Sequence, residues 1–139
     1  MKSASNYGFE ISANFSKKWG EHLLDLLIQY DYTFAQDDEL EKQLIYVPKQ
    51  KATTGINYDW RTWSANYNLQ YVGQVYTTTS NTEHLDDYWL SDLDFMKSIW
   101  RDRLYLSFKV NNIFNQLYQS VAYRPMPGRN YFINANFKF

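Results

Sequence analysis

Few residues of this chain have the types and spacing that catalysis or metal binding requires. The 139-residue sequence contains no cysteine, which excludes disulfide bonds and thiolate metal sites. Its two histidines, His22 and His84, are far apart in the sequence, and neither belongs to a Ser/His/Asp arrangement or a nucleophile elbow. We therefore expect no enzyme activity, no cofactor and no metal centre.

One acidic run could supply oxygen ligands to a calcium ion. It consists of Asp37, Asp38, Glu39 and Glu41. The run lacks the spaced Asp or Asn residues and the glycine of a dedicated calcium loop, so a solvated loop is the expected role and calcium binding stays open. The net charge of -1 and the pI of about 6.1 indicate no general attraction to nucleic acid, and we expect no nucleic-acid partner.

Aromatic residues make up 19% of the chain, yet its mean hydropathy is -0.60. Both values follow when every second residue of long strands is apolar and the others are polar. Helical periodicity competes only over residues 21–28. The alternating segments cover residues 7–16, 24–34, 52–60, 63–71, 88–99, 104–110 and 130–139.

These segments are about ten residues long, which is enough for a tilted strand to cross a bilayer. Short connections alternate with long ones, as in outer-membrane barrels. The short ones cover residues 17–21, 59–62 and 100–102, and the long ones 35–49, 73–87 and 112–129.

Tryptophans gather at the short connections, where they are expected to mark one boundary between hydrocarbon and water. They are Trp19, Trp60, Trp63 and Trp100. Near the opposite rim, Tyr46, Tyr71, Tyr76 and Tyr88 could form a second girdle. A soluble β-sandwich or barrel would show the same alternation, but its polar face would be richer in Lys and Glu.

The seven alternating segments are an odd number of strands, whereas single-chain bacterial barrels have even numbers from about eight upward. Open strand edges in hydrocarbon would cost several kcal/mol for each unpaired backbone group. Either an eighth strand completes a small barrel, or the segment belongs to a larger one. The first seven residues contain no apolar run typical of a signal peptide, which favours the larger barrel.

The end of the chain, residues 108–139, resembles the end of TonB-dependent outer-membrane receptors. The matching motifs are Asn112-Ile113-Phe114-Asn115, then Tyr118, then Pro127-Gly128-Arg129 and the final Phe139. Residues 46–81 are similar to that family too, through Val47-Pro48, Gly73 and Tyr76-Thr77-Thr78. The overall character resembles the Bacteroidetes receptors of siderophore and cobalamin type.

The resemblance implies an all-β fold: a transmembrane antiparallel β-barrel segment that supplies the last seven strands of a barrel of about 22 strands. Residues 1–139 would be the C-terminal part of the barrel, without the plug domain, the TonB box and the earlier strands. It also implies a place in the Gram-negative outer membrane and import of a scarce nutrient, such as a metal chelate or cobalamin, driven by TonB. The implied partners are outer-membrane lipid, the plug and the rest of the barrel, the TonB energising complex and the barrel-assembly machinery.

Three sets of residues are expected to act in such a receptor. Tyr76, Trp89, Tyr118 and Tyr123, in or beside the long loops, could stack on a ligand, or could serve in loop or girdle packing. Tyr131, Ile133, Phe137 and Phe139 resemble the C-terminal signal for barrel assembly. In the motifs, Pro127 and Gly128 are expected to end the loop sharply, Asn112 and Asn115 to bond to nearby backbone, and Arg129 to pair with a loop carboxylate.

Two other functions stay open from the sequence. One is a small self-contained outer-membrane barrel with a structural or adhesive role, and the other is a soluble β-sheet binding module. The sequence does not name a transported substrate.

Overall fold

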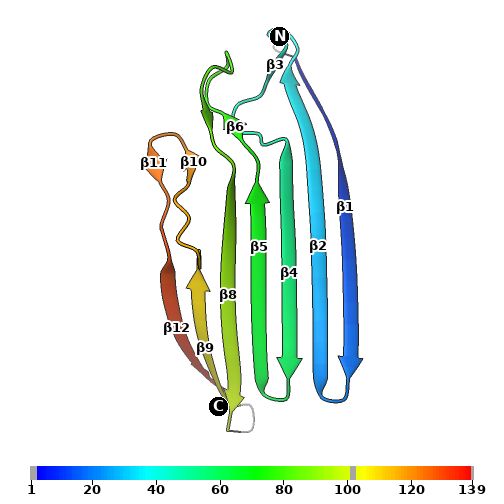
Figure 1. Cartoon of the computed structure of the whole chain (residues 1–139), viewed down its shortest axis with the longest axis vertical. Helices are drawn as coiled ribbons and strands as arrows, with labels where there is room; N and C mark the ends of the chain where they lie inside the picture. The colour runs from blue at the N-terminus through cyan, green and yellow to red at the C-terminus, as the bar shows by residue number, and fades with distance from the viewer. Residues whose placement is uncertain (1–2, 101–102, 139) are drawn as a thin grey trace.

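A computed structural model of the chain describes residues 3–100 and 103–138 as an all-β fold (Figure 1). Seven long antiparallel strands form one sheet in chain order, which confirms the fold class and all seven alternating segments, residues 21–28 included. They are β1 (Ala4–Trp19), β2 (His22–Asp37), β4 (Gln50–Trp60), β5 (Trp63–Val72), β8 (Tyr88–Ile99), β9 (Leu104–Asn111) and β12 (Asn130–Phe137). No helix in these residues is long and apolar enough to cross a membrane.

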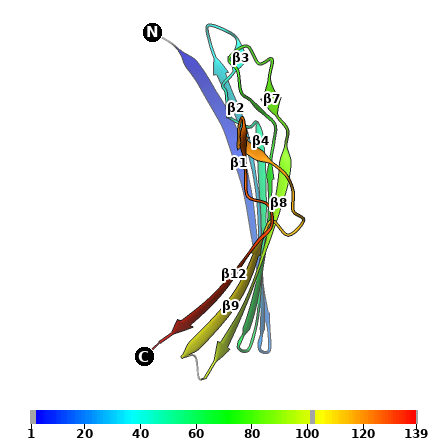
Figure 2. The same cartoon turned by 90° about the vertical axis from the view of Figure 1, so that its left-hand side faces the viewer.

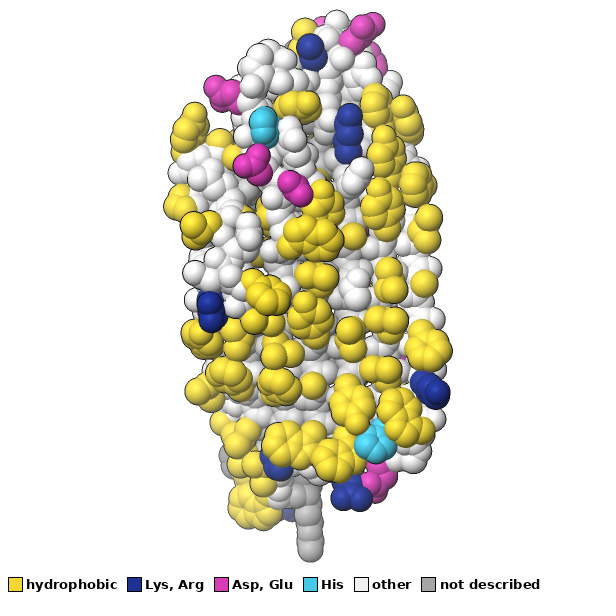
Figure 3. All heavy atoms as spheres, viewed as in Figure 1, with side chains coloured by type: hydrophobic (Ala, Val, Ile, Leu, Met, Phe, Trp, Pro, Cys, Tyr) yellow, Lys and Arg dark blue, Asp and Glu magenta, His cyan; other side chains and the backbone are white. Residues whose placement is uncertain are grey.

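The strand register places apolar residues opposite apolar residues across the whole sheet. In one pair Phe9 lies opposite Tyr32, and in another Leu26 lies opposite Ile56. The same face continues to the last strand, where Ile133 lies opposite Phe108. Because side chains alternate along a strand, the sheet has one apolar face and one polar face. Figure 3 shows hydrophobic side chains gathered over the apolar face.

Within residues 3–100 and 103–138, no second layer packs against the apolar face. Figure 2 shows the sheet from its edge as a single curved layer. Among the described residues the only buried apolar side chains are Ala35 and Val75, whereas Ile133 is 80% exposed and Tyr7 is 62% exposed. A soluble domain buries such side chains in a core, so this face requires an apolar surrounding.

The connections agree with the expected asymmetry. At one end, β1 and β2 are joined by Gly20 and Glu21 alone, and β4 and β5 by Arg61 and Thr62. At the other end the long loops carry five short strands that the alternation did not predict, because two or three residues are too few to show it. These are β3 (Lys42–Gln43), β6 (Val75–Tyr76), β7 (His84–Leu85), β10 (Gln119–Val121) and β11 (Arg124–Pro125).

The aromatic girdles are confirmed at one rim and corrected at the other. Trp19, Trp60 and Trp63 lie on the apolar face beside the short turns. At the loop rim Tyr71 packs against Trp89 on that face, with ring centroids 4.6 Å apart and the rings tilted by 38°. Tyr88, however, shares the polar face, and Tyr46 and Tyr76 belong to the loops.

Two glycines of the strands differ sharply in the space around them. A methyl group at Gly8 would stand 2.2 Å from the backbone oxygen of Tyr32, whereas at Gly55 the nearest atom would be 3.8 Å away, on Leu27. We predict that Gly8→Ala destabilises the assembled barrel by about 1–3 kcal/mol through overpacking. Gly55→Ala, the matched control, should leave stability nearly unchanged.

The measurement is the temperature at which the folded form of the complete, detergent-solubilised barrel loses its faster gel mobility. Equal melting of the two variants would contradict the tight approach of β1 and β2 at Gly8.

Candidate functional site

The polar face forms a hollow in the middle of the sheet. Its volume is about 660 Å³, and its walls come from six neighbouring strands, β1, β2, β4, β5, β8 and β9. Leu27 is the main apolar side chain on this face of the hollow, and Gly55 beside it leaves space. The polar residues lining it are Asn14, Ser16, Asp25, Asn57, Asn66, Asn68, Asp92, Asp94 and Lys109.

Charge in the hollow is mainly negative. Asp94 lies directly opposite Lys109 in the register of β8 and β9, and one of its carboxylate oxygens is buried with no hydrogen-bond partner among the described residues. A buried acceptor without a partner is costly, so this oxygen is suited to a donor from outside the segment. The face can hold a polar object by hydrogen bonds.

The long loops form a second layer above this face. The backbone N–H of Tyr46 donates to the backbone oxygen of Tyr76 at 2.9 Å, which ties the first loop to the β6–β7 hairpin. The Asn81 side chain donates to the backbone oxygen of Gln43 at 3.1 Å and adds to this tie. Between β7 and β10 lies a hollow of about 450 Å³. The loops are therefore an ordered rim with a cavity in it.

An aromatic pair stands in the wall of this rim cavity. The rings of Tyr88 and Tyr118 are in contact with centroids 4.6 Å apart and an interplanar angle of 39°, and both residues line the cavity. Burial, reinforced by the Asp92 carboxylate, raises the pKa of the Tyr118 hydroxyl. The sequence predicted Tyr118 as a ligand-binding candidate but not Tyr88. Tyr88 is an even number of positions from Asp92 and Asp94, so alternation alone places its side chain on the same polar face.

The structure does not bring the four ligand candidates together. Tyr118 lines the rim cavity, and Tyr76 lines a smaller hollow of about 270 Å³ with Tyr71 and Lys49. Trp89 lies on the apolar face, on the opposite side of the sheet from the polar hollow. Tyr123 is 89% exposed at the tip of the β10–β11 hairpin.

The C-terminal motif residues lock the end of the loop to the start of the last strand. The Asn112 side chain donates to the backbone oxygen of Gln116 at 2.8 Å and accepts from its N–H at 2.8 Å. Asn115 Oδ1 accepts the backbone N–H of Arg129 at 2.9 Å. The backbone bonds expected of the two asparagines are thus confirmed, and both have the positive φ that asparagine tolerates well.

Gly128 is required for a different reason from the one expected. Its φ is not positive, but a methyl group there would stand 2.6 Å from Asn115 Oδ1. The glycine therefore makes room for the acceptor that holds Arg129. Arg129 forms no ion pair with a carboxylate among residues 3–100 and 103–138, so the expected pairing is wrong. Phe114 points away from this lock and is 75% exposed.

The acidic loop is organised by its own hydrogen bonds. Asp37 accepts the backbone N–H groups of Glu39 and Leu40, and Asp38 accepts the Ser3 hydroxyl at 2.6 Å. The Ser3 and then the Ser5 side chain hold the pKa of the Asp38 carboxyl below its usual value. Within the described parts of the chain, no three His, Cys, Asp or Glu side chains are close enough to share a metal ion.

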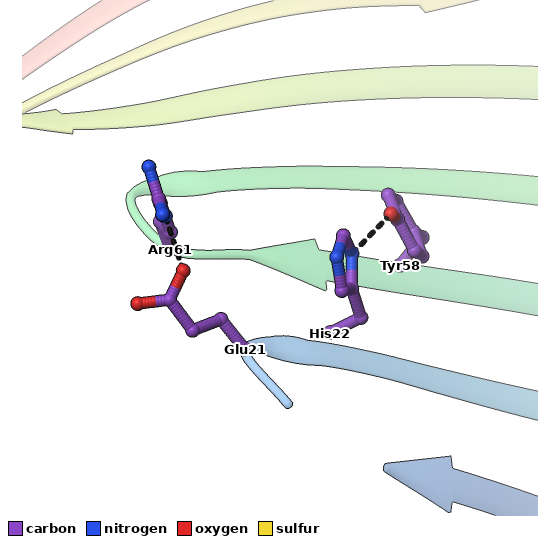
Figure 4. A network of polar contacts seen from close by, with 4 residues as sticks. All are labelled: Glu21, His22, Tyr58 and Arg61. Carbon is purple, nitrogen blue, oxygen red and sulfur yellow. Dashed lines mark hydrogen bonds and ion pairs between the residues drawn. The ribbon is translucent and has the colours of Figure 1, made fainter. Parts of the chain in front are cut away.

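At the opposite end of the sheet, His22 belongs to an aromatic cluster (Figure 4). Its Nδ1 is hydrogen-bonded to the Tyr58 hydroxyl at 2.7 Å, and its ring stacks between Trp19 and Trp60, with centroids 5.5 and 5.9 Å away. Arg61 and Glu21 form an exposed ion pair beside it. This is a structural use of the histidine within the rim.

A double-mutant cycle tests the C-terminal lock. Gly128→Ala should destabilise the barrel by about 1–3 kcal/mol through the clash with Asn115. Asn115→Gly should cost about 1 kcal/mol through the lost acceptor. In the Asn115→Gly background the alanine at 128 should cost almost nothing, because the clashing oxygen is gone. Urea unfolding of the complete barrel measures all three; additive effects would show that the two residues do not touch.

The chain matches proteins of one family in sequence and in fold. Residues 2–113 match the family model described as TonB dependent receptor-like, beta-barrel. All 139 residues align at 30% identity with the vitamin B12 transporter BtuB of Photobacterium profundum, of which they cover 22%. The chain thus spans about a fifth of the length of this curated relative.

Solved structures agree on the fold. The siderophore receptor PiuA of Acinetobacter baumannii superposes with a TM-score of 0.85 at 21% identity, over 99% of this chain and 22% of that one. The ferripyoverdine receptor of the Pseudomonas aeruginosa outer membrane gives a TM-score of 0.77 at 19% identity, over 99% and 20%. The chain belongs to the TonB-dependent receptor β-barrel family, and it is part of an outer-membrane protein of Gram-negative bacteria.

Proposed function

We propose that this chain is the C-terminal part of a barrel that imports a scarce nutrient across the outer membrane, driven by the TonB complex. The observation that carries the proposal is the two-faced sheet, whose apolar face is exposed while its polar face forms the hollow of about 660 Å³. A wall between lipid and a polar plug needs these two faces. The family supports the same function, since it consists of receptors and transporters, not enzymes.

The free edges of the sheet support a larger barrel. Neither β1 nor β12 has a partner on its outer side among the described strands, and the two do not pair with each other. An open edge in hydrocarbon would leave backbone groups unsatisfied at several kcal/mol each. Further strands would remove that cost, and the short share of each relative that the chain covers leaves room for them. A small self-contained barrel would need the closure that β1 and β12 lack here.

The loop rim suits a bulky, partly planar ligand. Tyr88 and Tyr118 offer two adjacent aromatic rings at the wall of the cavity of about 450 Å³. Aromatic faces stack well on planar groups such as catecholates or a macrocycle. A metal chelate or cobalamin has this chemistry, and the relatives are a vitamin B12 transporter and siderophore receptors. We assign ligand contact to Tyr118 and Tyr76 rather than to Trp89, which faces away.

Uptake in cells tests the import function. A Gram-negative host without its own receptors for iron chelates and cobalamin should regain growth on one of these nutrients when it expresses the complete receptor. The growth should be lost again when TonB is deleted, because passage through a plugged barrel requires energy. Growth that does not depend on TonB, or no uptake of any chelate by a correctly assembled receptor, would refute the proposal.

Tyr118 and Tyr123 form a matched pair for the ligand site. Tyr118→Ala should raise the half-saturating ligand concentration about fivefold, the value of one aromatic stacking contact of roughly 1 kcal/mol. Tyr123→Ala should leave it unchanged, because that side chain is 89% exposed at a hairpin tip. Binding of radiolabelled ligand to cells measures both. A larger loss at Tyr123 would place the ligand above the rim cavity.

The last strand can display the assembly signal. Tyr131, Ile133 and Phe137 lie on the apolar face of β12, next to its free edge, while Phe139 lies outside the described residues. We propose that the assembly machinery reads these side chains as the strand enters the membrane. The neighbouring Asn134 has the opposite orientation and bonds to Ser107.

Ile133→Asp should therefore lower the amount of folded receptor in the outer membrane, because a charged side chain on the lipid face is destabilising near the midplane. Asn134→Asp should lower it little. Quantitative blotting of outer-membrane fractions measures both. Equal yields would mean that the apolar face does not meet lipid.

A further inference from the structure

Charge is distributed very unequally between the two faces of the sheet. The strand carboxylates all fall on the polar face: Glu10, Asp25, Asp31, Asp37, Asp59, Asp92 and Asp94. The apolar face of the same strands contains no carboxylate and two lysines, Lys17 and Lys97. Both lysines lie at the short-turn end. A lysine in the middle of this face would cost about 2–4 kcal/mol, whereas at the rim its ammonium can reach the interface, where an anionic group is available to it.

The strand register arranges five side chains of this rim in one row, which we call the rim strip. From β1 to β8 they are Trp19, His22, Trp60, Trp63 and Lys97, each directly opposite the next across a strand pair. The row is continuous, because the ring of His22 stacks on Trp19 with an interplanar angle of 11° and on Trp60 with an angle of 3°.

Lys97 ends the strip over an aromatic ring. Its Nζ stands 3.7 Å from the ring centroid of Trp63, and the Arg61 guanidinium lies 5.5 Å from that of Trp60. Lys17 precedes Trp19 by two residues on the same face. Among the described residues the carboxylate beside the strip is that of Glu21, which pairs with Arg61. The described part of this rim thus has a surplus of cations, with indole N–H donors beside them.

From β2 to β8 the next rows toward the middle of the membrane are apolar, and Lys17 of β1 lies opposite Leu24 at the end of the first of them. Leu24, Tyr58, Ala65 and Phe95 lie opposite one another in the row that follows the strip, and Leu26, Ile56, Tyr67 and Leu93 in the next. A molecule held by its phosphate at the strip would extend its acyl chains along these side chains. Free phosphate would gain no such contact.

We propose that the rim strip binds the phosphate group of an anionic glycerophospholipid in the leaflet that meets the short turns. Lys97 and Lys17 supply the charge, the indoles of Trp63 and Trp60 supply N–H donors and flat apolar walls, and the rows above take the acyl chains. This inference rests on the proposed function in one respect, the contact of the apolar face with lipid.

The test is lipid binding by the complete receptor in dodecyl maltoside. Dibrominated phosphatidylglycerol, whose bromines quench indole fluorescence at short range, is titrated into the protein. Lys97→Met should raise the half-quenching lipid fraction about fivefold, and Lys17→Met with Lys97→Met about tenfold or more. Lys97→Arg should bind like the wild type. Lys18→Met is the matched control, because Lys18 follows Lys17 but faces the polar side, and it should change nothing.

Two further arms separate the sources of the signal. Dibrominated diacylglycerol, which lacks phosphate, should quench the wild type and Lys97→Met equally. Inorganic phosphate at millimolar concentration should not displace the phospholipid; displacement that depends on Lys97 would mean a free-phosphate site and overturn the proposal. Equal phosphatidylglycerol binding by the wild type, Lys97→Met and the double variant would overturn it too, provided that all keep the folded gel mobility.

Failure of the inference can be told from failure of the proposed function. A receptor that assembles and takes up its nutrient normally, yet binds phosphatidylglycerol without dependence on Lys97, refutes only the rim strip. A receptor that shows the lysine-dependent binding but transports nothing refutes only the import function.

Discussion

The structure depends on one constraint: the alternation of apolar and polar residues has to stay in register across seven strands. A slip of one residue in any strand pair would move a whole row of side chains to the wrong face. The observed register avoids this from Phe9 opposite Tyr32 to Ile133 opposite Phe108. The same ladders satisfy the backbone N–H and C=O groups, which have no other partners in hydrocarbon. One register therefore both separates apolar from polar side chains and pairs the backbone groups.

The chain ends follow from that constraint. Among the described strands the eight-residue β12 pairs with β9 alone, so the register of this pair depends on where β12 begins. The bond from the Arg129 N–H to Asn115 Oδ1 supplies this point immediately before Asn130, where β12 begins. Asn130 then accepts from the Asn111 side chain at 3.0 Å, so the first register pair of β12 is held twice. The loop motif thus acts on the sheet through strand register.

The sequence was sufficient to predict the long strands, because each one shows a repeating alternation. It was insufficient to predict contacts between residues that are far apart in the chain. Alternation located all seven long strands, although β1 and β2, at 16 residues each, extend beyond the expected ends. Alternation along β8 could also have assigned Tyr88 to the polar face, because Tyr88 is an even number of positions from Asp92 and Asp94. The contact between Asn115 and Gly128 could not be foreseen, because it depends on the path of the intervening loop. The position of Asp94 opposite Lys109 likewise requires the register of β8 and β9.

The side chains on the apolar face also set the limits of the hydrocarbon layer. In β8, Trp89 marks the loop rim and Lys97 the short-turn rim, eight residues away, or about 26 Å along the strand. A tilt of about 40° reduces this to roughly 20 Å along the membrane normal, and the apolar band of such barrels is about 25 Å tall. Lys97 therefore lies within a few ångströms of the boundary, where its stem can follow the Trp63 ring while its ammonium reaches out of the hydrocarbon. Because the cost of a charge falls to about 0–1 kcal/mol at this depth, a phosphate contact there need only be weak to make the lysine favourable.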